Sequence, residues 1–519
     1  MCSASPFPSP GRPPRSVVLI RPDTLGDLVL FSAALAGLRG AWPEARLAVV
    51  VREPFLTLGR LLVPGIDWIA TSINPFVQGP TECTEELARL QAEVAGREPE
   101  LVVAACPQRH WLDAALAAAA PAARQVAFGS NAEDPFFGRQ LRFRFGVAPA
   151  ELFAETAPAM GGGQDWERGY GLMEYLTGRP LVHEPPVLVL DGARRQFAEA
   201  VAQGLGLAAG RYAAVAAAGF ANVAIKTWPA ERFAETIAWL HRERGLPTLL
   251  VGHRGEHSYL ETVAATAGAE AARVWVGDEG ELPLLAGLLG NARIFLGNDT
   301  GAMHLAAALG VPVAAVFGGG TWPRFQPAAV RSVALVNPLP CFGCGWDCPF
   351  GDAPCVRAVA VDDACAALAD LLDGGEEEQS EIRELERLPA ETAALMGRVA
   401  ALARERTAAH LAREHQLEET VFLAGEKDAE IAALKDAANE RSDAVHEKEA
   451  EVHEKDGEIK RLAQALAESR ADAAGKDVEI KNLAQANDER LQLIIRLDRD
   501  LRAMVAREKM NVDRPPPPA

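Results

Sequence analysis

The chain has 519 residues, a formal net charge of −19 and eight cysteines. Its length exceeds that of one ordinary domain, and the acidic balance offers no broad cationic face for nucleic acid. Eight cysteines in so long a chain do not indicate a disulfide scaffold. The negative charge is concentrated late in the chain, where residues 373–519 carry 23 basic and 34 acidic side chains.

Residues 1–15 are rich in proline and serine and lack the apolar stretch of a signal peptide. We expect a disordered lead-in and a cytoplasmic protein. Residues 300–323 contain no charged side chain, but Pro312 and the glycines at 318–320 argue against a membrane-spanning helix.

The first predicted domain, residues 16–180, alternates strands and helices. Strands are predicted at 17–20, 47–51 and 101–105, with a helix at 28–39. This alternation is typical of a parallel sheet with helices on its faces.

The second predicted domain, residues 181–372, repeats the scheme after a glycine- and proline-rich hinge at 177–186. We predict strands at 212–217, 248–251, 273–276, 294–296 and 313–317, and helices at 231–244, 256–266, 282–289 and 302–309. Two such domains in tandem would leave a cleft between them.

A loop with phosphate-binding chemistry follows the strand at 294–296. It supplies the carboxylate of Asp299, the hydroxyl of Thr300 and, at the start of a helix, Gly301. Open α/β sheets bind ligands at the carboxyl ends of their strands, and a helix N-terminus offers N–H groups to phosphate. The loop therefore predicts a nucleotide-phosphate site; the alternative is an ordinary βαβ unit in which Asp299 or Thr300 caps the helix.

Residues 376–511 are predicted to form a long helix that pairs as a coiled coil. Similar five-residue words begin at Lys427, Lys455 and Lys476, at offsets of 28 and 21, which are multiples of seven. One seam is apolar and places Asn487 where it would fix the register, while the other is polar over 441–455. We expect a homo-oligomer; a solvated single helix is the alternative. Residues 512–519 form a proline-rich tail.

Three motifs, at 23–27, 226–229 and 298–304, stand in order along the two α/β domains. Together they resemble the heptosyltransferase family of glycosyltransferases, family nine, over roughly residues 15–372. The resemblance implies an α/β fold of GT-B architecture, with two facing Rossmann-like domains and the active site between them, here followed by the coiled coil. It also implies transfer of a sugar, with inversion, from a nucleoside diphosphate donor, typically ADP-heptose, to the inner core of lipopolysaccharide.

The resemblance assigns roles to residues of the three motifs. Asp27 matches the proposed general base, with a helix cap as the alternative, and Lys226 matches the lysine that binds donor phosphate, although most lysines simply lie on the surface. The donor site is further assigned Asp299, Thr300 and Gly301, and His304 is either a supporting partner or a core histidine. Glu256 matches a ribose-binding glutamate, although it would also favour the dipole of the helix that it opens.

We predict no cofactor and no metal in the donor site, because the single Asp-x-Asp, Asp498–Asp500, lies in the coiled coil. A weaker metal candidate is the cluster Cys341, Cys344, Cys348 and Cys355, which could bind zinc, remain reduced or form a redox-labile disulfide.

The stretch 136–145 alternates aromatic and basic residues. Arg139, Arg142 and Arg144 are candidates for binding the phosphates or carboxylates of an anionic glycan or glycolipid acceptor. An amphipathic strand with its arginines outward is a compatible alternative.

The resemblance thus implies an inverting glycosyltransferase with a nucleotide-sugar donor and peripheral contact with the inner face of the inner membrane, and the acidic composition predicts no nucleic-acid partner. One alternative is a GT-B enzyme that acts on another glycan or on a protein. Another is a non-catalytic, nucleotide-sugar-binding coiled-coil scaffold.

Overall fold

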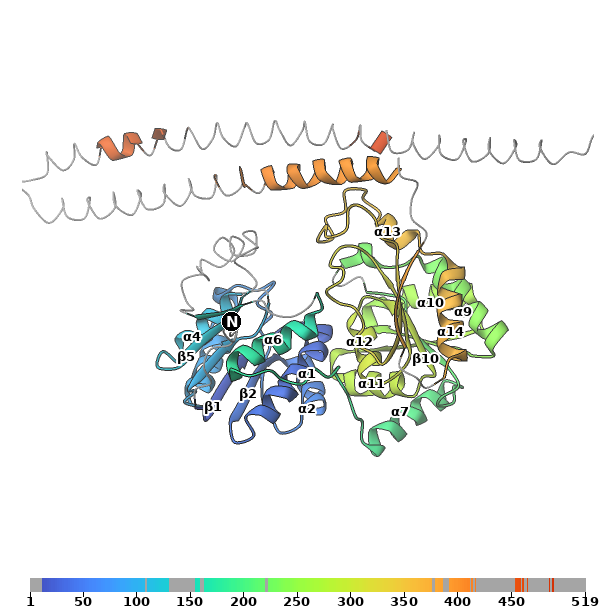
Figure 1. The fold of residues 1–519 in the computed structure, drawn as a ribbon, viewed down its shortest axis with the longest axis horizontal. Helices are drawn as coiled ribbons and strands as arrows, with labels where there is room; N and C mark the ends of the chain where they lie inside the picture. Colours follow the sequence, from blue (N-terminus) through green and yellow to red (C-terminus); the bar gives the residue numbers. More distant parts are fainter. Residues whose placement is uncertain are drawn as a thin grey trace, which may run out of the picture. The chain divides into compact units, whose positions relative to one another are not determined.

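The computed structural model describes residues 12–107, 110–129, 155–158, 163–219, 223–375, 379–385 and 392–410, with short helical pieces between 412 and 489. It divides into two compact units, residues 1–404 and 405–519. The first unit contains two parallel sheets, which Figure 1 shows in blue to turquoise and in green to orange. None of the helices described in the structure combines the length and the apolar character needed to cross a membrane.

The N-terminal domain is built on a six-stranded parallel sheet of order β3-β2-β1-β4-β5-β6. Its strands are β1 (Ser16–Ile20), β2 (Arg46–Arg52), β3 (Asp67–Thr71), β4 (Leu101–Ala104), β5 (Arg124–Gly129) and β6 (Glu155–Pro158). Its helices are α1 (Leu25–Ala41), α2 (Leu56–Leu62), α3 (Thr84–Ala95), α4 (Trp111–Ala118) and α6 (Asp165–Thr177), with short 3-10 turns η1 (Glu53–Phe55) and η2 (Pro80–Glu82).

The C-terminal domain is built on a seven-stranded parallel sheet of order β13-β12-β11-β10-β7-β8-β9. Its strands are β7 (Ala213–Ala216), β8 (Thr248–His253), β9 (Ala272–Gly277), β10 (Ile294–Asn298), β11 (Val313–Phe317), β12 (Arg331–Val336) and β13 (Gln379–Glu384). Its helices are α7 (Gly192–Gly204), α9 (Ala230–Arg244), α10 (His257–Ala267), α11 (Leu282–Gly290), α12 (Gly301–Ala308), α13 (Pro354–Arg357) and α14 (Val361–Asp373), with 3-10 turns η4 (Ala224–Lys226), η5 (Arg254–Glu256) and η6 (Glu279–Glu281).

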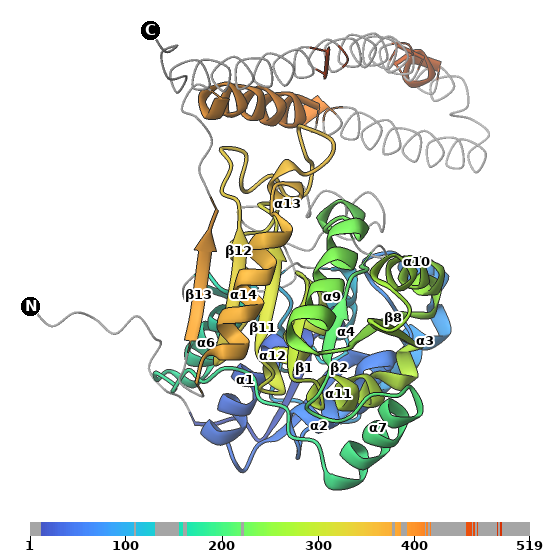
Figure 2. The same cartoon turned by 90° about the vertical axis from the view of Figure 1, so that its right-hand side faces the viewer.

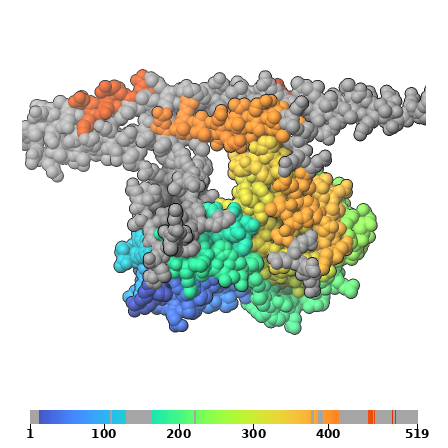
Figure 3. Space-filling model, viewed as in Figure 1, coloured from blue at the N-terminus to red at the C-terminus, as the bar shows by residue number. Residues whose placement is uncertain are grey.

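Helices cover both faces of each sheet. In the N-terminal domain, α1, α2 and α6 pack on one face and α3 and α4 on the other. In the C-terminal domain, α14 lies against β11 and β12 beside α9, as Figure 2 shows. A single apolar cluster runs from α1 and α6 to α11 and α12, so the inner faces of the two domains share one core. Figure 3 shows the turquoise surface of α6 adjoining the yellow and orange surface of the C-terminal domain.

Each sheet reverses its strand order beside its central strand. In the first, β1 lies between β2 and β4, and in the second, β7 lies between β8 and β10. Ligands of open α/β sheets bind at such switch points, outside the carboxyl ends of the strands. The segments after β1, β7 and β10 are those that carry the three sequence motifs, so the topology brings the motifs to the expected edges.

The structure corrects the start of the predicted C-terminal helix. We expected helix from residue 376, but Gln379–Glu384 form β13, which pairs in parallel with β12. Ile382 lies between the charged residues Glu381 and Arg383. The hydroxyl oxygens of Ser380 and of Ser332 in β12 are 3.3 Å apart. Charged side chains are usual on an edge strand. Because this segment is as rich in charged residues as the region that follows it, we predicted helix here. Most of the heptad positions, Asn487 among them, lie outside the described residues.

Candidate active site

The loop after β1 leads directly into α1 and presents Asp27 in the first turn of that helix. The Thr24 hydroxyl donates a hydrogen bond to Asp27 Oδ2 at 2.5 Å. No side-chain bond caps the helix from Thr24. The Asp27 side chain is only 12 % exposed, so its carboxylate is fixed and partly dehydrated at the end of the strand.

Arg21 lies beneath this loop with a side chain that is 2 % exposed. Its Nη1 donates to the carbonyl of Ala105 after β4 at 2.6 Å, and its guanidinium lies 4.8 Å from the Phe31 ring centre. Nη2 is 3.5 Å from Asp23 Oδ2 and 4.0 Å from Asp27 Oδ1. A buried guanidinium therefore offsets the charge of the two loop carboxylates.

The Asp23 carboxyl is strongly perturbed by its surroundings. Burial, and then the neighbouring Asp27, raise the pKa of Asp23 well above its ordinary value against the opposing pull of Arg21. Close carboxyl groups cannot easily ionise together. Asp23 and Asp27 therefore behave as a carboxyl pair on the N-terminal side of the site.

The loop after β10 presents the second set of predicted residues. Asn298 is buried and its Oδ1 accepts from the Trp228 backbone N–H at 2.9 Å, which ties this loop to the Lys226 segment. Thr300 Oγ1 is buried and has no hydrogen-bond partner within the described part of the chain. An unpaired buried hydroxyl at the start of α12 is available to a ligand oxygen.

The N-termini of α1 and α12, which belong to different domains, are in direct contact. Two glycines at this contact leave room for the close approach. A Cβ at Gly26 would lie 3.0 Å from His304 Cδ2, and a Cβ at Gly301 would lie 2.9 Å from Leu25 Cβ. Both positions thus need glycine for the helix ends to approach. Helix N-termini carry partial positive charge, so their convergence favours binding of an anion beside this contact.

Lys226, Asp299 and His304 share one electrostatic environment with Asp27. Burial raises the pKa of Asp299 to about 6, with Lys226 opposing and Asp27 adding to the shift. Burial lowers the pKa of His304 to about 4, so the ring is neutral at pH 7. The ring lies 3.9 Å from Asp299, between Nε2 and Oδ1. These influences place the base candidate and the donor candidates in one site.

Lys226 is the only lysine among residues 1–426. It ends the 3-10 turn η4 after β7 and is half-buried. None of the ion pairs described in the structure includes its ammonium group, although its charge acts on the nearby carboxyl of Asp299. The charge is therefore available to an anionic ligand.

A cavity of about 200 Å³ lies beside the α12 N-terminus. Its lining includes Leu25 from the N-terminal domain, Thr300, Trp275, and the carboxylates Glu256, Asp278 and Glu281. Glu256 also accepts from the His253 backbone N–H at 2.9 Å, so it caps a turn as well as lining the cavity. An aromatic wall with carboxylate acceptors suits the base and ribose of a nucleoside.

Asp165 and Arg324 connect the two domains next to this site. Arg324 Nε donates to Asp165 Oδ1 at 2.7 Å, and the Asp165 N–H donates to the Arg324 carbonyl at 2.8 Å. Burial alone would raise the pKa of Asp165, but Arg324 and then Arg21 outweigh it and hold the pKa below its ordinary value.

The four clustered cysteines come together after β12, over the glycine loop at 318–320. Burial raises the pKa of Cys341 to about 12, and the other three thiols add to the shift. Cys355 Sγ accepts from the Gly319 N–H at 3.5 Å. Among the residues that the structure places, no group of His, Cys, Asp or Glu has a metal-binding arrangement. All four cysteines have free thiols in this structure.

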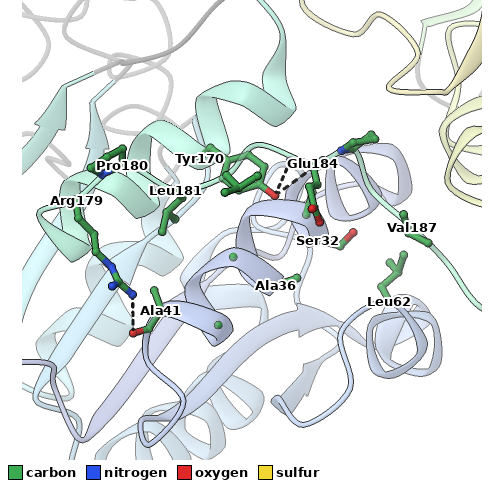
Figure 4. A pocket seen from close by; sticks show the side chains of 15 residues that line it. Ser32, Ala36, Ala41, Leu62, Tyr170, Arg179, Pro180, Leu181, Glu184 and Val187 are labelled. Atoms are coloured by element: carbon green, nitrogen blue, oxygen red, sulfur yellow. Dashed lines mark hydrogen bonds between the residues drawn. The ribbon is translucent and has the colours of Figure 1, made fainter. Parts of the chain in front are cut away.

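A second cavity lies on the N-terminal domain between α1, α6 and the linker at 179–187 (Figure 4). The Tyr170 hydroxyl donates to the Glu184 carbonyl at 3.2 Å, and Arg179 Nη2 donates to the Ala41 carbonyl at 3.2 Å. These bonds hold the linker to the domain. None of the residues assigned to the active site lines this cavity.

The structure brings Asp27, Lys226, Asp299, Thr300, Gly301 and His304 to one interdomain site, with Glu256 in the adjoining cavity. Arg139, Arg142 and Arg144 lie outside the described residues, so their predicted acceptor role stays a prediction. Sequence reasoning missed Arg21, Asp23, Asp165 and Arg324. Arg21 and Asp23 could have been noticed as charges directly after a buried strand, whereas the two others lie far from any motif.

Residues 162–346 match the family model for glycosyltransferase family 9 (heptosyltransferase). The fold resembles that of a glycosyl transferase family 9 protein from Veillonella parvula, with a TM-score of 0.53 and 19 % identity over 69 % of this chain and 97 % of that chain. It also resembles the E. coli ADP-heptose lps heptosyltransferase II, with a TM-score of 0.51 and 17 % identity over 69 % of this chain and 98 % of that chain. No curated protein matches the sequence. Identities this low establish the fold, two Rossmann-like domains in the GT-B arrangement, and the family match identifies a glycosyltransferase family 9 (heptosyltransferase) domain at residues 162–346.

Proposed function

We propose that this chain transfers heptose, with inversion, from ADP-heptose to an acceptor that resembles the core of lipopolysaccharide. The observation that carries the proposal is the meeting of Asp27 with the Lys226 and Asp299 loops from opposite domains. One of the similar solved structures is named as an ADP-heptose lps heptosyltransferase, and the family model carries the heptosyltransferase description.

Asp27 acts as the general base in this mechanism. The acceptor hydroxyl attacks the anomeric carbon from the side opposite the diphosphate, and Asp27 takes its proton. A carboxylate is a far weaker base than a sugar alkoxide, so Asp27 accepts the proton only as the hydroxyl becomes acidic in the transition state. The hydrogen bond from Thr24 fixes the orientation of the carboxylate.

The donor side stabilises the departing diphosphate. The nucleoside occupies the cavity beside Trp275 and Glu256, and the diphosphate lies between Lys226 and the start of α12. As the glycosidic bond breaks, negative charge grows on the leaving phosphate, and a fixed ammonium and backbone N–H groups stabilise it. Asp299 accepts from hydroxyls of the sugar.

Two donor-site variants should separate phosphate binding from sugar binding. Lys226→Ala should weaken binding of both ADP and ADP-heptose by about tenfold or more, because each loses a charge-assisted contact. Asp299→Ala should weaken the binding of ADP-heptose but leave the affinity for ADP within a few-fold of wild type. Calorimetric titration measures both, with Arg242→Ala, a cation on the exposed surface of α9, as control.

Both bindings should persist in excess EDTA, since the Asp-x-Asp motif falls at 498–500, outside the two α/β domains. Equal ADP affinity in wild type and Lys226→Ala would remove Lys226 from the phosphate site. Binding that is lost in EDTA and restored by magnesium would contradict the metal-free donor site.

We also propose that the C-terminal heptads set assembly and not chemistry. Because β13 extends the sheet past the expected boundary, a truncation should retain residues 1–404, the first compact unit. That fragment should be monomeric and active, whereas the full chain should be at least dimeric. Light scattering coupled to size exclusion measures both masses. A monomeric full-length chain at micromolar concentration would contradict the assembly role.

A further inference from the structure

One buried carboxylate lies between two guanidinium groups from different parts of the chain. The side chain of Asp165, at the start of α6, is 2 % exposed. Its Oδ1 accepts from Arg324 Nε at 2.7 Å, and its Oδ2 lies 3.6 Å from Arg21 Nη2. Asp165 therefore divides its charge between Arg324 and Arg21.

Arg21 in turn faces the carboxyl pair of the reaction site. Nη2 is the nitrogen that lies 3.5 Å from Asp23, 3.6 Å from Asp165 and 4.0 Å from Asp27. It is buried, yet it has no hydrogen-bond partner by geometric criteria in the described part of the chain. Its positive charge thus interacts with three carboxylates. The strength of its interaction with Asp27 depends on how strongly it also interacts with Asp165.

Arg324 brings the other domain into this arrangement. It follows β11 of the C-terminal domain, whereas Arg21 and Asp165 flank the inner face of the N-terminal domain. Gln164 and Gln326 add a side-chain bond of 3.2 Å between the same two segments. The Asp165–Arg324 contact can form only when these segments meet, so it reports the association of the domains at the site.

We propose that Asp165 is a positioning residue for the base Asp27, acting through Arg21, and that Arg324 links this action to the meeting of the two domains. The inference rests on the proposed role of Asp27 in the transfer. Asp165 keeps Arg21 from fully neutralising Asp27, and the Asp27 carboxylate stays a competent proton acceptor. The bond from Arg324 weakens the electrostatic interaction between Asp165 and Arg21.

Several other titratable or charged groups act on Asp27 and define the background of any pH effect. On the N-terminal side they are Asp23 on its own loop and Cys106 after β4. From the C-terminal domain, Asp299 and His304 are coupled electrostatically to Asp27, and Lys226 and Arg324 act on Asp299. The Asp165→Asn variant keeps all of these residues and replaces a charge by an amide of nearly the same shape, although it also removes the influence of Asp165 on His304.

The test is the pH dependence of kcat/KM, measured as ADP release from ADP-heptose with truncated lipopolysaccharide as acceptor. In Asp165→Asn, Arg21 acts more fully on Asp27, so the acidic limb should move down by about half a pH unit or more and kcat should fall. In Arg324→Gln, Asp165 engages Arg21 more strongly, and the limb should move up. With asparagine already at position 165, adding Arg324→Gln should shift the limb by less than half of the shift that it causes in the wild-type background, because Arg324 acts on Asp27 through Asp165.

A purely structural role would lower stability or active fraction without moving the limb. Asp67→Asn serves as the matched control, since it removes one carboxylate of an exposed ion pair with Arg97 in the same domain. An acidic limb that stays in place in Asp165→Asn, or two single variants that shift it in the same direction, overturns the inference. Wild-type turnover in Asp27→Asn would instead overturn the proposed function, so the two failures are distinguishable.

Discussion

Replacing Asp27 by asparagine should reduce kcat by about 10²-fold or more while leaving the affinity for ADP-heptose within a few-fold of wild type. The amide cannot accept the proton of the acceptor hydroxyl. It can still accept the hydrogen bond from Thr24 that fixes the wild-type side chain. Asp27 lies on the N-terminal domain, across from the donor loops, so donor binding has little dependence on it. Single-turnover measurement of ADP release separates the chemical step from binding.

Asp27→Glu provides the conservative comparison, because it keeps a carboxylate and changes only its reach. It should recover part of the lost turnover. An asparagine variant with undiminished kcat would contradict the base assignment, and so would a variant whose whole loss lies in donor affinity.

Replacing Arg21 by methionine should destabilise the protein by about 3–5 kcal/mol at pH 8, because removing one partner from a buried ionic group leaves uncompensated charge. Asp23, Asp27 and Asp165 all lie within 4.0 Å of its Nη2. The thermal midpoint should fall on the order of 5 °C or more. Differential scanning calorimetry of the full-length chain measures this.

The loss should be smaller at pH 6 than at pH 8. Asp23 already has a raised pKa in the folded protein, and without Arg21 that pKa rises further. A carboxyl with a raised folded pKa binds more protons when folded, so it contributes less stability as pH rises towards that pKa. In the variant this penalty grows with pH more steeply than in wild type.

Arg39→Met is the matched control for the Arg21 variant. Arg39 Nη1 also donates to one backbone carbonyl, that of Ala45 at 2.8 Å, but no carboxylate cluster is described around it. A similar loss in both variants, with the same pH dependence, would show that packing and the carbonyl bond, rather than charge compensation, explain the role of Arg21.

The sequence was sufficient to predict the parallel α/β domains and most of the site loops. Apolar runs such as those that form β1, β10 and β11 are buried from end to end, and a buried parallel strand has a nearly continuous apolar pattern. The motifs at 23–27 and 298–304 directly follow two of these strands, so chain order alone predicts their place at the carboxyl edges of the sheets. Shorter or more polar strands, such as β3 and β13, carry a weaker signal and were missed.

The charges that tune the site were beyond the reach of local patterns. Asp165 opens α6 and Arg324 lies in a loop of the other domain, 159 residues away in the chain. Nothing in the spacing of either residue predicts their contact, because it depends on how the two domains pack. The glycines show the same limit: Gly26 and Gly301 have the pattern of ordinary helix-start residues, and only the packing of α1 on α12 shows why a side chain would not fit.

The most direct test of the account is a calorimetric titration of the full-length chain with ADP-heptose in excess EDTA, for wild type and for Lys226→Ala. We predict saturable, one-site binding to the wild-type chain and an affinity reduced by about tenfold or more in the variant. Absence of binding to the wild-type chain, or equal affinity in both proteins, would contradict the proposed donor site.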